Sequence, residues 1–338
     1  MNTPRTCIDR ILPRDLNRPQ RMMMIGGRSH AVIVFSKLWV NGSTLKVRFL
    51  DGTQSQKAIA IEQAGWWTEH ANLNFEFSDA GSSDIRITFD QNDGAWSYIG
   101  TDASSIPQNQ ATMNLGFIDG GTAAHEFGHA IGLAHEHQNP NAGIEWNESV
   151  VISALSGPPN NWSEATIRHN VLNKYAVDQV RGTSFDKDSI MLYFFPDSWV
   201  RNGQGTSANE ELSLTDSDFI ASAKAYPKLD TTTPVVELPV ISTDGVMAEI
   251  GEVGEEDVFT FSVTKEGRHT IETGGQTDVV MKLFGPNSET NLIKEDDDGG
   301  TGRNSKIVAD LIRGEYLVQI RHYNSSRGTG QYSIVVKN

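Results

Sequence analysis

The stretch that decides the fold reads His125-Glu126-Phe127-Gly128-His129-Ala130-Ile131-Gly132-Leu133-Ala134-His135. Residues four apart lie on one face of a helix, so His125 and His129 can bind the same metal ion. Glu126 is one residue along, where it can take a proton from an attacking water without being a ligand itself. Gly132 can adopt the left-handed conformation that ends a helix and turns His135 back towards the ion. Three imidazoles with an open fourth position predict a catalytic site for one Zn²⁺ ion.

A methionine further along the chain supports this interpretation. Met191 stands in the run Asp188-Ser189-Ile190-Met191-Leu192-Tyr193. Its soft thioether suits a tight turn packed beneath three imidazoles, which is typical of metzincin peptidases. The sequence therefore predicts an α+β peptidase domain with a mixed sheet, a zinc helix and a Met-turn.

The chain resembles the astacin family of metzincins over about residues 37–227. The resemblance is carried by the continuation Glu136-His137, the turn Ser-Ile-Met-x-Tyr, the pair Leu38-Trp39, and the run Trp96-Ser97-Tyr98-Ile99-Gly100. It implies that Tyr193 ligates zinc, swings aside for substrate and then stabilises the oxyanion. It also implies that Glu136 pairs with a newly freed N-terminal amine.

The activity implied by this resemblance is that of a metalloendopeptidase acting on protein or peptide substrates, with Glu126 as general base. The resemblance also implies that the strand over residues 111–117 is the edge to which an extended peptide adds in the antiparallel direction. The residues expected to contact the peptide are Met113, Asn114 and Leu115. Two alternatives stay open. One is a matrixin-like peptidase, in which Tyr193 would only pack, and the other is a zinc-containing protein-binding module on a peptidase scaffold.

Residues 1–30 are polar and broken by proline, and we expect them to form a propeptide-like extension ahead of a catalytic domain at 31–228. A thiolate is a strong zinc ligand, so Cys7 could occupy the open position and keep the enzyme latent. Asp9 or Asp15 could serve instead, and a free thiol on an exposed tail is the plain alternative. Cys7 is the chain's one cysteine, so no intrachain disulfide can form, whereas astacins usually carry disulfides in this domain.

The character of the sequence changes after a linker at residues 229–239. Short alternating runs separated by glycine turns predict an all-β sandwich over 240–338. This domain resembles the pre-peptidase C-terminal domains of secreted bacterial peptidases, which implies a role in export or in binding matrix or surface polymers. The matching features are Asp257-Val258-Phe259, the loop 295–305, and the ending Gly314-Glu315-Tyr316 through Gly330-Gln331-Tyr332.

The second domain also carries an acidic run, Asp296-Asp297-Asp298, followed by two glycines. Its carboxylates offer the hard oxygen ligands that Ca²⁺ prefers. A solvated acidic turn is the alternative interpretation. Calcium is therefore a second cofactor that the sequence suggests without fixing its ligands.

The composition of the chain limits which partners and which cellular locations we expect. Lys and Arg total 28 against 43 Asp and Glu, and the formal net charge of −15 argues against a nucleic-acid partner. No stretch approaches the roughly 18 apolar residues needed to span a bilayer, and the N-terminus has no secretory signal pattern. The family resemblance favours secretion, while a cytoplasmic location or non-classical export stays open. We expect a monomer.

Overall fold

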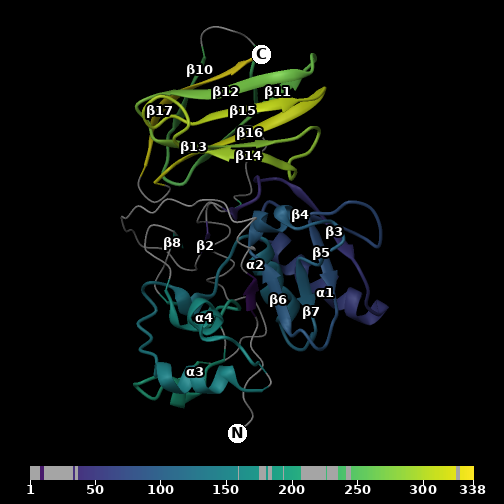
Figure 1. Cartoon of the computed structure of the whole chain (residues 1–338), viewed down its shortest axis with the longest axis vertical. Helices are drawn as coiled ribbons and strands as arrows, with labels where there is room; N and C mark the ends of the chain where they lie inside the picture. Colours follow the sequence, from purple (N-terminus) through teal and green to yellow (C-terminus); the bar gives the residue numbers. More distant parts are fainter. Residues whose placement is uncertain are drawn as a thin grey trace. The chain divides into compact units, whose positions relative to one another are not determined.

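A computed structural model describes the chain over residues 8–10, 33–34, 37–158, 160–174, 180–181, 185–192, 194–206, 226, 235–240, 245–324 and 328–338 (Figure 1). Of residues 8–10, 33–34 and 180–181 it describes the backbone alone. The chain divides into two compact units. The first comprises Met1–Trp39 and Leu45–Pro227, and the second comprises Val40–Thr44 and Lys228–Asn338.

The first unit is built on a six-stranded mixed sheet with the order β1-β6-β7-β5-β3-β4. Its strands are β1 (Ile8–Arg10), β3 (Thr44–Phe49), β4 (Asn74–Ser78), β5 (Ile85–Thr88), β6 (Ala95–Tyr98) and β7 (Met113–Leu115). Strands β3, β5 and β7 run parallel, β6 is antiparallel to β7, and β1 is parallel to β6. A separate two-stranded sheet joins β2 (Ile33–Val34) to β8 (Val180–Arg181). The predicted mixed sheet is confirmed.

Two helices pack together beside this sheet: α1 (Gln54–Thr68) and α2 (Thr122–Ala130), which carries the first two histidines (Figure 1). Helix α1 begins with a capping box, in which Thr53 and Gln56 each accept a hydrogen bond from the other's backbone N–H. The remaining helical segments are η2 (Gly100–Ser105), η3 (Glu136–Gln138), α3 (Glu148–Ser156), α4 (Glu164–Ile167), the π-helical η4 (Arg168–Leu172) and η5 (Asp197–Trp199). None of the helices in the described ranges is long and apolar enough to cross a membrane.

Two apolar clusters form the interior of the first unit. One lies between the sheet, α1 and α2, and includes Val47, Ile87, Trp67, Phe127 and Met191. The other is built from later segments, and includes Trp146, Val151, Ile167, Phe195 and Trp199. Burial of these large side chains provides most of the driving force for folding.

The prediction that Met113, Asn114 and Leu115 form the edge strand is wrong. They make up β7, which pairs with β5 on one side and β6 on the other, and all three are buried. On this side of β7 the next strand is β6, and β1 pairs along the outer edge of β6 as the last strand of the sheet. The side chain of Asn114 serves the fold instead: its amide donates to the carbonyls of Asp90 and Gly94 and so holds the turn that precedes β6.

A buried guanidinium fixes the connection that follows β6. Arg86 is fully buried and donates hydrogen bonds to the carbonyl oxygens of Ser83, Ala103, Ile106 and Gln110. Burial is the main cause that lowers the pKa of Arg86, to about 10. The five donors of the guanidinium suit this role because they can bind several diverging carbonyls at once.

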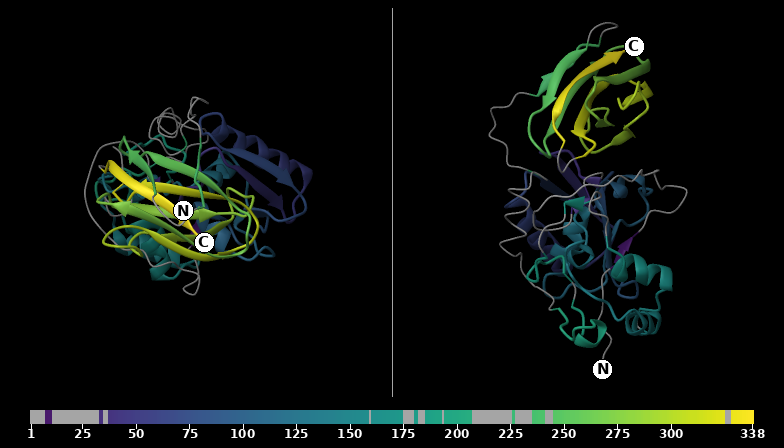
Figure 2. Two further views of the ribbon diagram at one scale, coloured as in Figure 1. Left: turned by 90° about the horizontal axis from the view of Figure 1, so that it is seen from above. Right: turned by 90° about the vertical axis from the view of Figure 1, so that its left-hand side faces the viewer.

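The second unit is a β-sandwich, as predicted from the sequence. Its sheets have the orders β10-β17-β12-β15 and β14-β13-β16-β11-β9, and they face each other across a common apolar core (Figure 2). The strands are β9 (Val236–Glu237), β10 (Val246–Ile250), β11 (Glu256–Val263), β12 (Gly267–Gly275), β13 (Val279–Phe284), β14 (Leu292–Asp296), β15 (Lys306–Leu311), β16 (Gly314–His322) and β17 (Gly330–Lys337). Alternation along β11 places Phe259, Phe261 and Val263 in the core.

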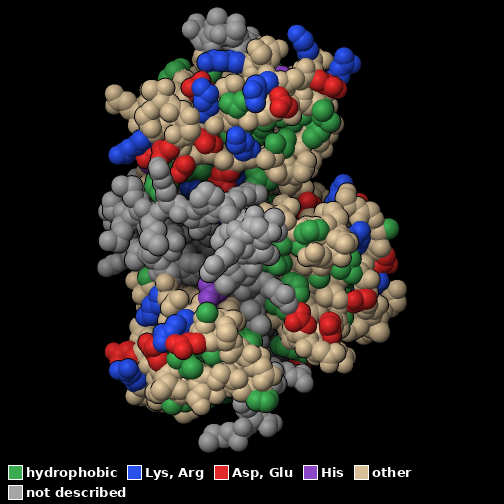
Figure 3. Space-filling model, viewed as in Figure 1, with side chains coloured by type: hydrophobic (Ala, Val, Ile, Leu, Met, Phe, Trp, Pro, Cys, Tyr) green, Lys and Arg blue, Asp and Glu red, His purple; other side chains and the backbone are tan. Residues whose placement is uncertain are grey.

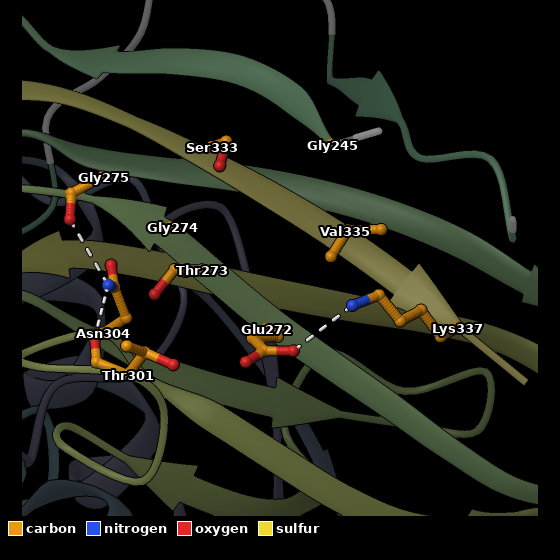
Figure 4. Close-up of a pocket in the computed structure, with 10 residues that line it drawn as sticks. All are labelled: Gly245, Glu272, Thr273, Gly274, Gly275, Thr301, Asn304, Ser333, Val335 and Lys337. Carbon is orange, nitrogen blue, oxygen red and sulfur yellow. Dashed lines mark hydrogen bonds and ion pairs between the residues drawn. The ribbon is translucent and has the colours of Figure 1, made fainter. Parts of the chain in front are cut away.

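The surface of this sandwich includes one polar hollow. A hollow of about 390 Å³ lies on the four-stranded sheet, where Glu272 on β12 pairs with Lys337 on β17 at 3.4 Å (Figure 4). Ser333 and Asn304 also line it, and none of the histidines does. On the face shown in Figure 3, acidic and basic side chains are interspersed, so the net charge of −15 does not gather into one patch there.

One carboxylate joins the two sheets of the sandwich. The Tyr332 hydroxyl on β17 donates to Asp257 Oδ2 on β11 at 2.5 Å. Burial raises the pKa of Asp257 to about 6, although the hydrogen bond from Tyr332 acts in the opposite direction and the nearby Glu255 charge adds to the rise. The folded carboxyl therefore holds its proton to higher pH than the unfolded one.

This difference predicts that the free energy of unfolding of the second unit falls as pH rises from 4 to 7, because the folded state binds more protons over that range. Asp257→Asn keeps an acceptor for Tyr332 and removes the titration. In this variant the fall in the free energy of unfolding between pH 4 and 7 should be smaller by roughly 1–2 kcal/mol, allowing for partial solvent screening. Calorimetry of the full chain at several pH values measures the free energy of unfolding of the second unit in each variant. The exposed Asp310 on β15 provides the control variant Asp310→Asn; an unchanged slope in Asp257→Asn would contradict the assignment.

Candidate metal centre

The three predicted histidines come together. Nε2 of His129 lies 3.1 Å from Nε2 of His125 and 3.0 Å from Nε2 of His135. Zinc–nitrogen bonds of about 2.0–2.1 Å in a tetrahedral arrangement would place such nitrogens about 3.3 Å apart. Within the part of the chain that the structure describes, these residues form the one group of His, Cys, Asp or Glu placed to hold a metal. An all-imidazole donor set suits zinc.

Backbone carbonyls orient two of the imidazoles. Nδ1 of His125 lies 2.7 Å from the carbonyl oxygen of Ile190, and Nδ1 of His129 lies 2.8 Å from that of Leu133. A carbonyl can only accept, so each Nδ1 must carry the proton in these hydrogen bonds. In a neutral imidazole this leaves the lone pair on Nε2, where the metal would bind.

The helix that carries His125 and His129 is held by side chains from other elements. Its N-cap is Gly121, which offers no side chain, and Gln63 of α1 does the capping instead. Gln63 Oε1 accepts from the Ala124 amide, and its Nε2 donates to the Gly120 carbonyl at 2.6 Å. The Trp67 indole donates to the Ala124 carbonyl. The sequence analysis did not find these contacts, because residues about 60 positions apart give no spacing signal.

The third histidine returns to the site through the turn at the end of α2. Gly132 has φ +103°, its amide donates to the His129 carbonyl, and the Leu133 amide donates to the Gly128 carbonyl. These two hydrogen bonds make a Schellman motif, which requires the left-handed conformation that glycine adopts without strain. The expected reversal of the chain at Gly132 is what the structure shows, and it carries His135 to the other two imidazoles.

The Met-turn packs directly beneath the helix. A Cβ added at Gly128 would clash with Met191 Sδ and lie 3.0 Å from Trp67 Cζ2, so any larger residue would force these side chains or the helix to shift. The backbone of the turn also connects to the ligands, because Ile190 accepts from His125 and Met191 accepts from the Glu136 amide at 2.9 Å. Helix, third ligand and turn therefore form one interlocked group.

The other predicted site residues are placed only in part. Glu126 lies on α2 beside His125 and is fully buried. Glu136 is also buried, and its Oε1 accepts from the Asp186 amide and from Asn139 Nδ2. Tyr193 and Cys7 lie outside the described residues. In the acidic run, Asp296 Oδ2 accepts from the amides of Gly299 and Lys306.

Comparison with known proteins identifies the family of the chain that carries this site. The model of the astacin peptidase family matches residues 33–208, which is more than half of the chain. The chain belongs to the astacin family. Over 193 residues this astacin is 27% identical to blastula protease 10 of Paracentrotus lividus, covering 55% of the chain and 29% of that protein. It spans less than a third of the length of the curated relatives it matches.

Two solved structures are each similar to part of this astacin. Myroilysin shares 37% identity, with a TM-score of 0.55 and coverage of 59% of this chain and 99% of that chain. The pre-peptidase C-terminal domain of a collagenase from Bacillus anthracis shares 17% identity over 31% of this chain and 99% of that domain, with a TM-score of 0.27. For the second unit, the fold assignment comes from the two-sheet sandwich itself.

The close approach of Gly128 and Met191 predicts the effect of a single methyl group. Gly128→Ala should overpack the contact, lower the free energy of unfolding by about 1–3 kcal/mol, and weaken zinc binding by shifting α2 against the Met-turn. Thermal unfolding and chelator competition measure the two effects.

The matched control is Gly65→Ala in α1, where an added Cβ meets no atom within 4 Å. That change should stabilise the chain by about 0.5–1 kcal/mol. Equal behaviour of the two variants would show that the contact with Met191 does not limit the packing.

Proposed function

We propose that this chain is a zinc-dependent endopeptidase that hydrolyses peptide bonds in proteins. The observation that carries the proposal is the convergence of three imidazole nitrogens beside Glu126, in a chain of the astacin family. His125, His129 and His135 would hold the metal. Zinc, when bound, supplies a Lewis acid that polarises the scissile carbonyl and acidifies water.

The protein's own groups would carry out the proton transfers. Glu126 accepts a proton from the attacking water and then passes it to the leaving amine. Its place on α2, one residue after a ligand, keeps it close to the metal without binding it. Tyr193, two residues after Met191, is proposed as a further ligand and as a donor to the oxyanion. Glu136 is proposed to pair with the N-terminal amine of a processed chain.

The outer edge of β6 is proposed to bind the substrate. Helix α2 packs against this strand, so a peptide paired along residues 95–98 would pass close to the histidines. An antiparallel peptide would form main-chain hydrogen bonds with β6, which provide affinity for many sequences.

Glu126→Gln separates a peptidase from a binding module. The amide cannot act as a base, so casein cleavage should fall by at least about 10²-fold while zinc stays bound. Cleavage assays and metal analysis of the purified chain test this, with Glu62→Gln on the exposed face of α1 as the control. Retained cleavage would remove Glu126 from the mechanism. A chain that binds zinc but cleaves nothing, even without its leader, would favour the binding module.

The leader is proposed to keep the enzyme latent. Strand β1 occupies the outer edge of β6, with Ile8 opposite Trp96 and Arg10 opposite Tyr98. It runs parallel to β6, opposite to the direction proposed for substrate, so it would occupy the proposed substrate position without presenting a bond in the productive orientation. Cys7 directly precedes this strand, which supports its proposed role as a zinc ligand.

Latency through Cys7 predicts that the thiol is protected while zinc is bound. Alkylation of the full chain should be slow with zinc and at least about tenfold faster after chelation, because a coordinated thiolate is a poor nucleophile. Cys7→Ser should raise cleavage of a peptide substrate. Labelling at the same rate in both states would rule out Cys7 as a ligand and leave Asp9 or Asp15 to be tested.

The second unit is proposed to aid export or to hold polymeric substrates, in keeping with a secreted enzyme. Calcium at Asp296, Asp297 and Asp298 stays a prediction, and the amides bound by Asp296 already satisfy part of its carboxylate.

A further inference from the structure

We propose that His137 is a positioning residue for the third metal ligand, His135. This inference rests on the proposed zinc site and concerns how that site is held in shape. The imidazole of His137 is fully buried and stacks on that of His135, with ring centroids 5.0 Å apart and an interplanar angle of 25°.

The third ligand needs such support more than the other two. His125 and His129 project from one face of α2, so the helix itself fixes their spacing. His135 has extended backbone, with φ −66° and ψ 134°, and lies beyond the turn at Gly132. A side chain at such a position gets its orientation from what packs against its ring, and His137 covers one face.

The ring of His137 is itself held from two directions. Its Nε2 lies 2.8 Å from the carbonyl oxygen of Asn170 in η4 and must donate to it, because a carbonyl only accepts. Phe195 meets the ring edge-on at 4.9 Å and Trp146 does so at 6.0 Å. Asn170 is buried in turn and donates to the Thr166 carbonyl.

These contacts connect the metal site to the second apolar cluster of the first unit. Phe195 and Trp146 belong to that cluster, whereas Met191 and Phe127 beside the zinc helix belong to the first. The stack of His137 on His135 therefore transmits the packing of the second cluster to the third ligand. Groups that orient a metal ligand typically change metal affinity by 10–100-fold when replaced.

Two replacements separate the ring from the hydrogen bond. His137→Gln keeps a donor near the position of Nε2 but removes the ring, and His137→Phe keeps the ring but removes the donor. We expect the Gln variant to lose about 10–100-fold in zinc affinity by chelator competition, and the Phe variant to lose less. In the cobalt-substituted protein, the visible absorption of the Gln variant should shift, while that of the Phe variant should stay close to wild type. In the Gln variant, kcat should also fall with little change in KM.

The control is His269→Phe in the second unit, where a buried histidine contacts the Gly267 carbonyl and no metal ligand. It should leave zinc affinity and the cobalt spectrum unchanged. If His137→Gln fails to fold, Phe195→Leu removes an aromatic ring that packs against His137 and should weaken zinc binding several-fold.

Zinc affinity within about twofold of wild type in the folded His137→Gln variant, or in Phe195→Leu where that variant does not fold, would overturn the inference. Failure of the wild-type chain to bind zinc would instead overturn the proposed function, so the two failures are distinguishable.

Discussion

The requirement that a third imidazole return to a helix that has already ended shapes the whole first unit. A helix can present two histidines on one face, but a third on the same turn would point elsewhere. The chain meets this requirement with the left-handed Gly132 and a Schellman motif, which reverse its direction within a few residues. The interlocked Met-turn then fixes the reversed segment, because Met191 accepts from Glu136 and packs against Gly128.

Side chains from the surrounding fold fix both ends of α2, the helix that carries His125 and His129. Gln63 and Trp67 bind the start of α2, while the Trp39 indole and the Tyr226 hydroxyl donate to the Ala130 and Ile131 carbonyls at its end. Each hydrogen bond contributes only about 0.5–1.5 kcal/mol, but a buried helix end without partners would be costly. Preorganised ligands are what a catalytic metal site needs, since affinity and geometry both depend on them.

The proposed substrate binding and the proposed latency both depend on the outer edge of β6. An outer strand offers unpaired backbone groups that will pair with any extended segment. In this chain the leader strand β1 pairs with β6 in the parallel direction, and the proposed substrate would use the same groups in the antiparallel one. Competition for one set of backbone donors and acceptors would be the physical basis of the proposed latency.

From the sequence alone we could predict the zinc motif and the alternating strands of the sandwich. These features are local: the spacing from His125 to His135, the turn at Gly132 and the alternation along β11 are each set within a few residues. Nothing local could show that β7 lies inside the sheet, because strand order depends on pairing between distant segments and both β6 and β7 are short. The same holds for Gln63 capping α2 and for His137 stacking on His135 against Phe195. These contacts become visible in the folded structure alone, because packing brings together residues whose separation along the chain carries no periodic signal.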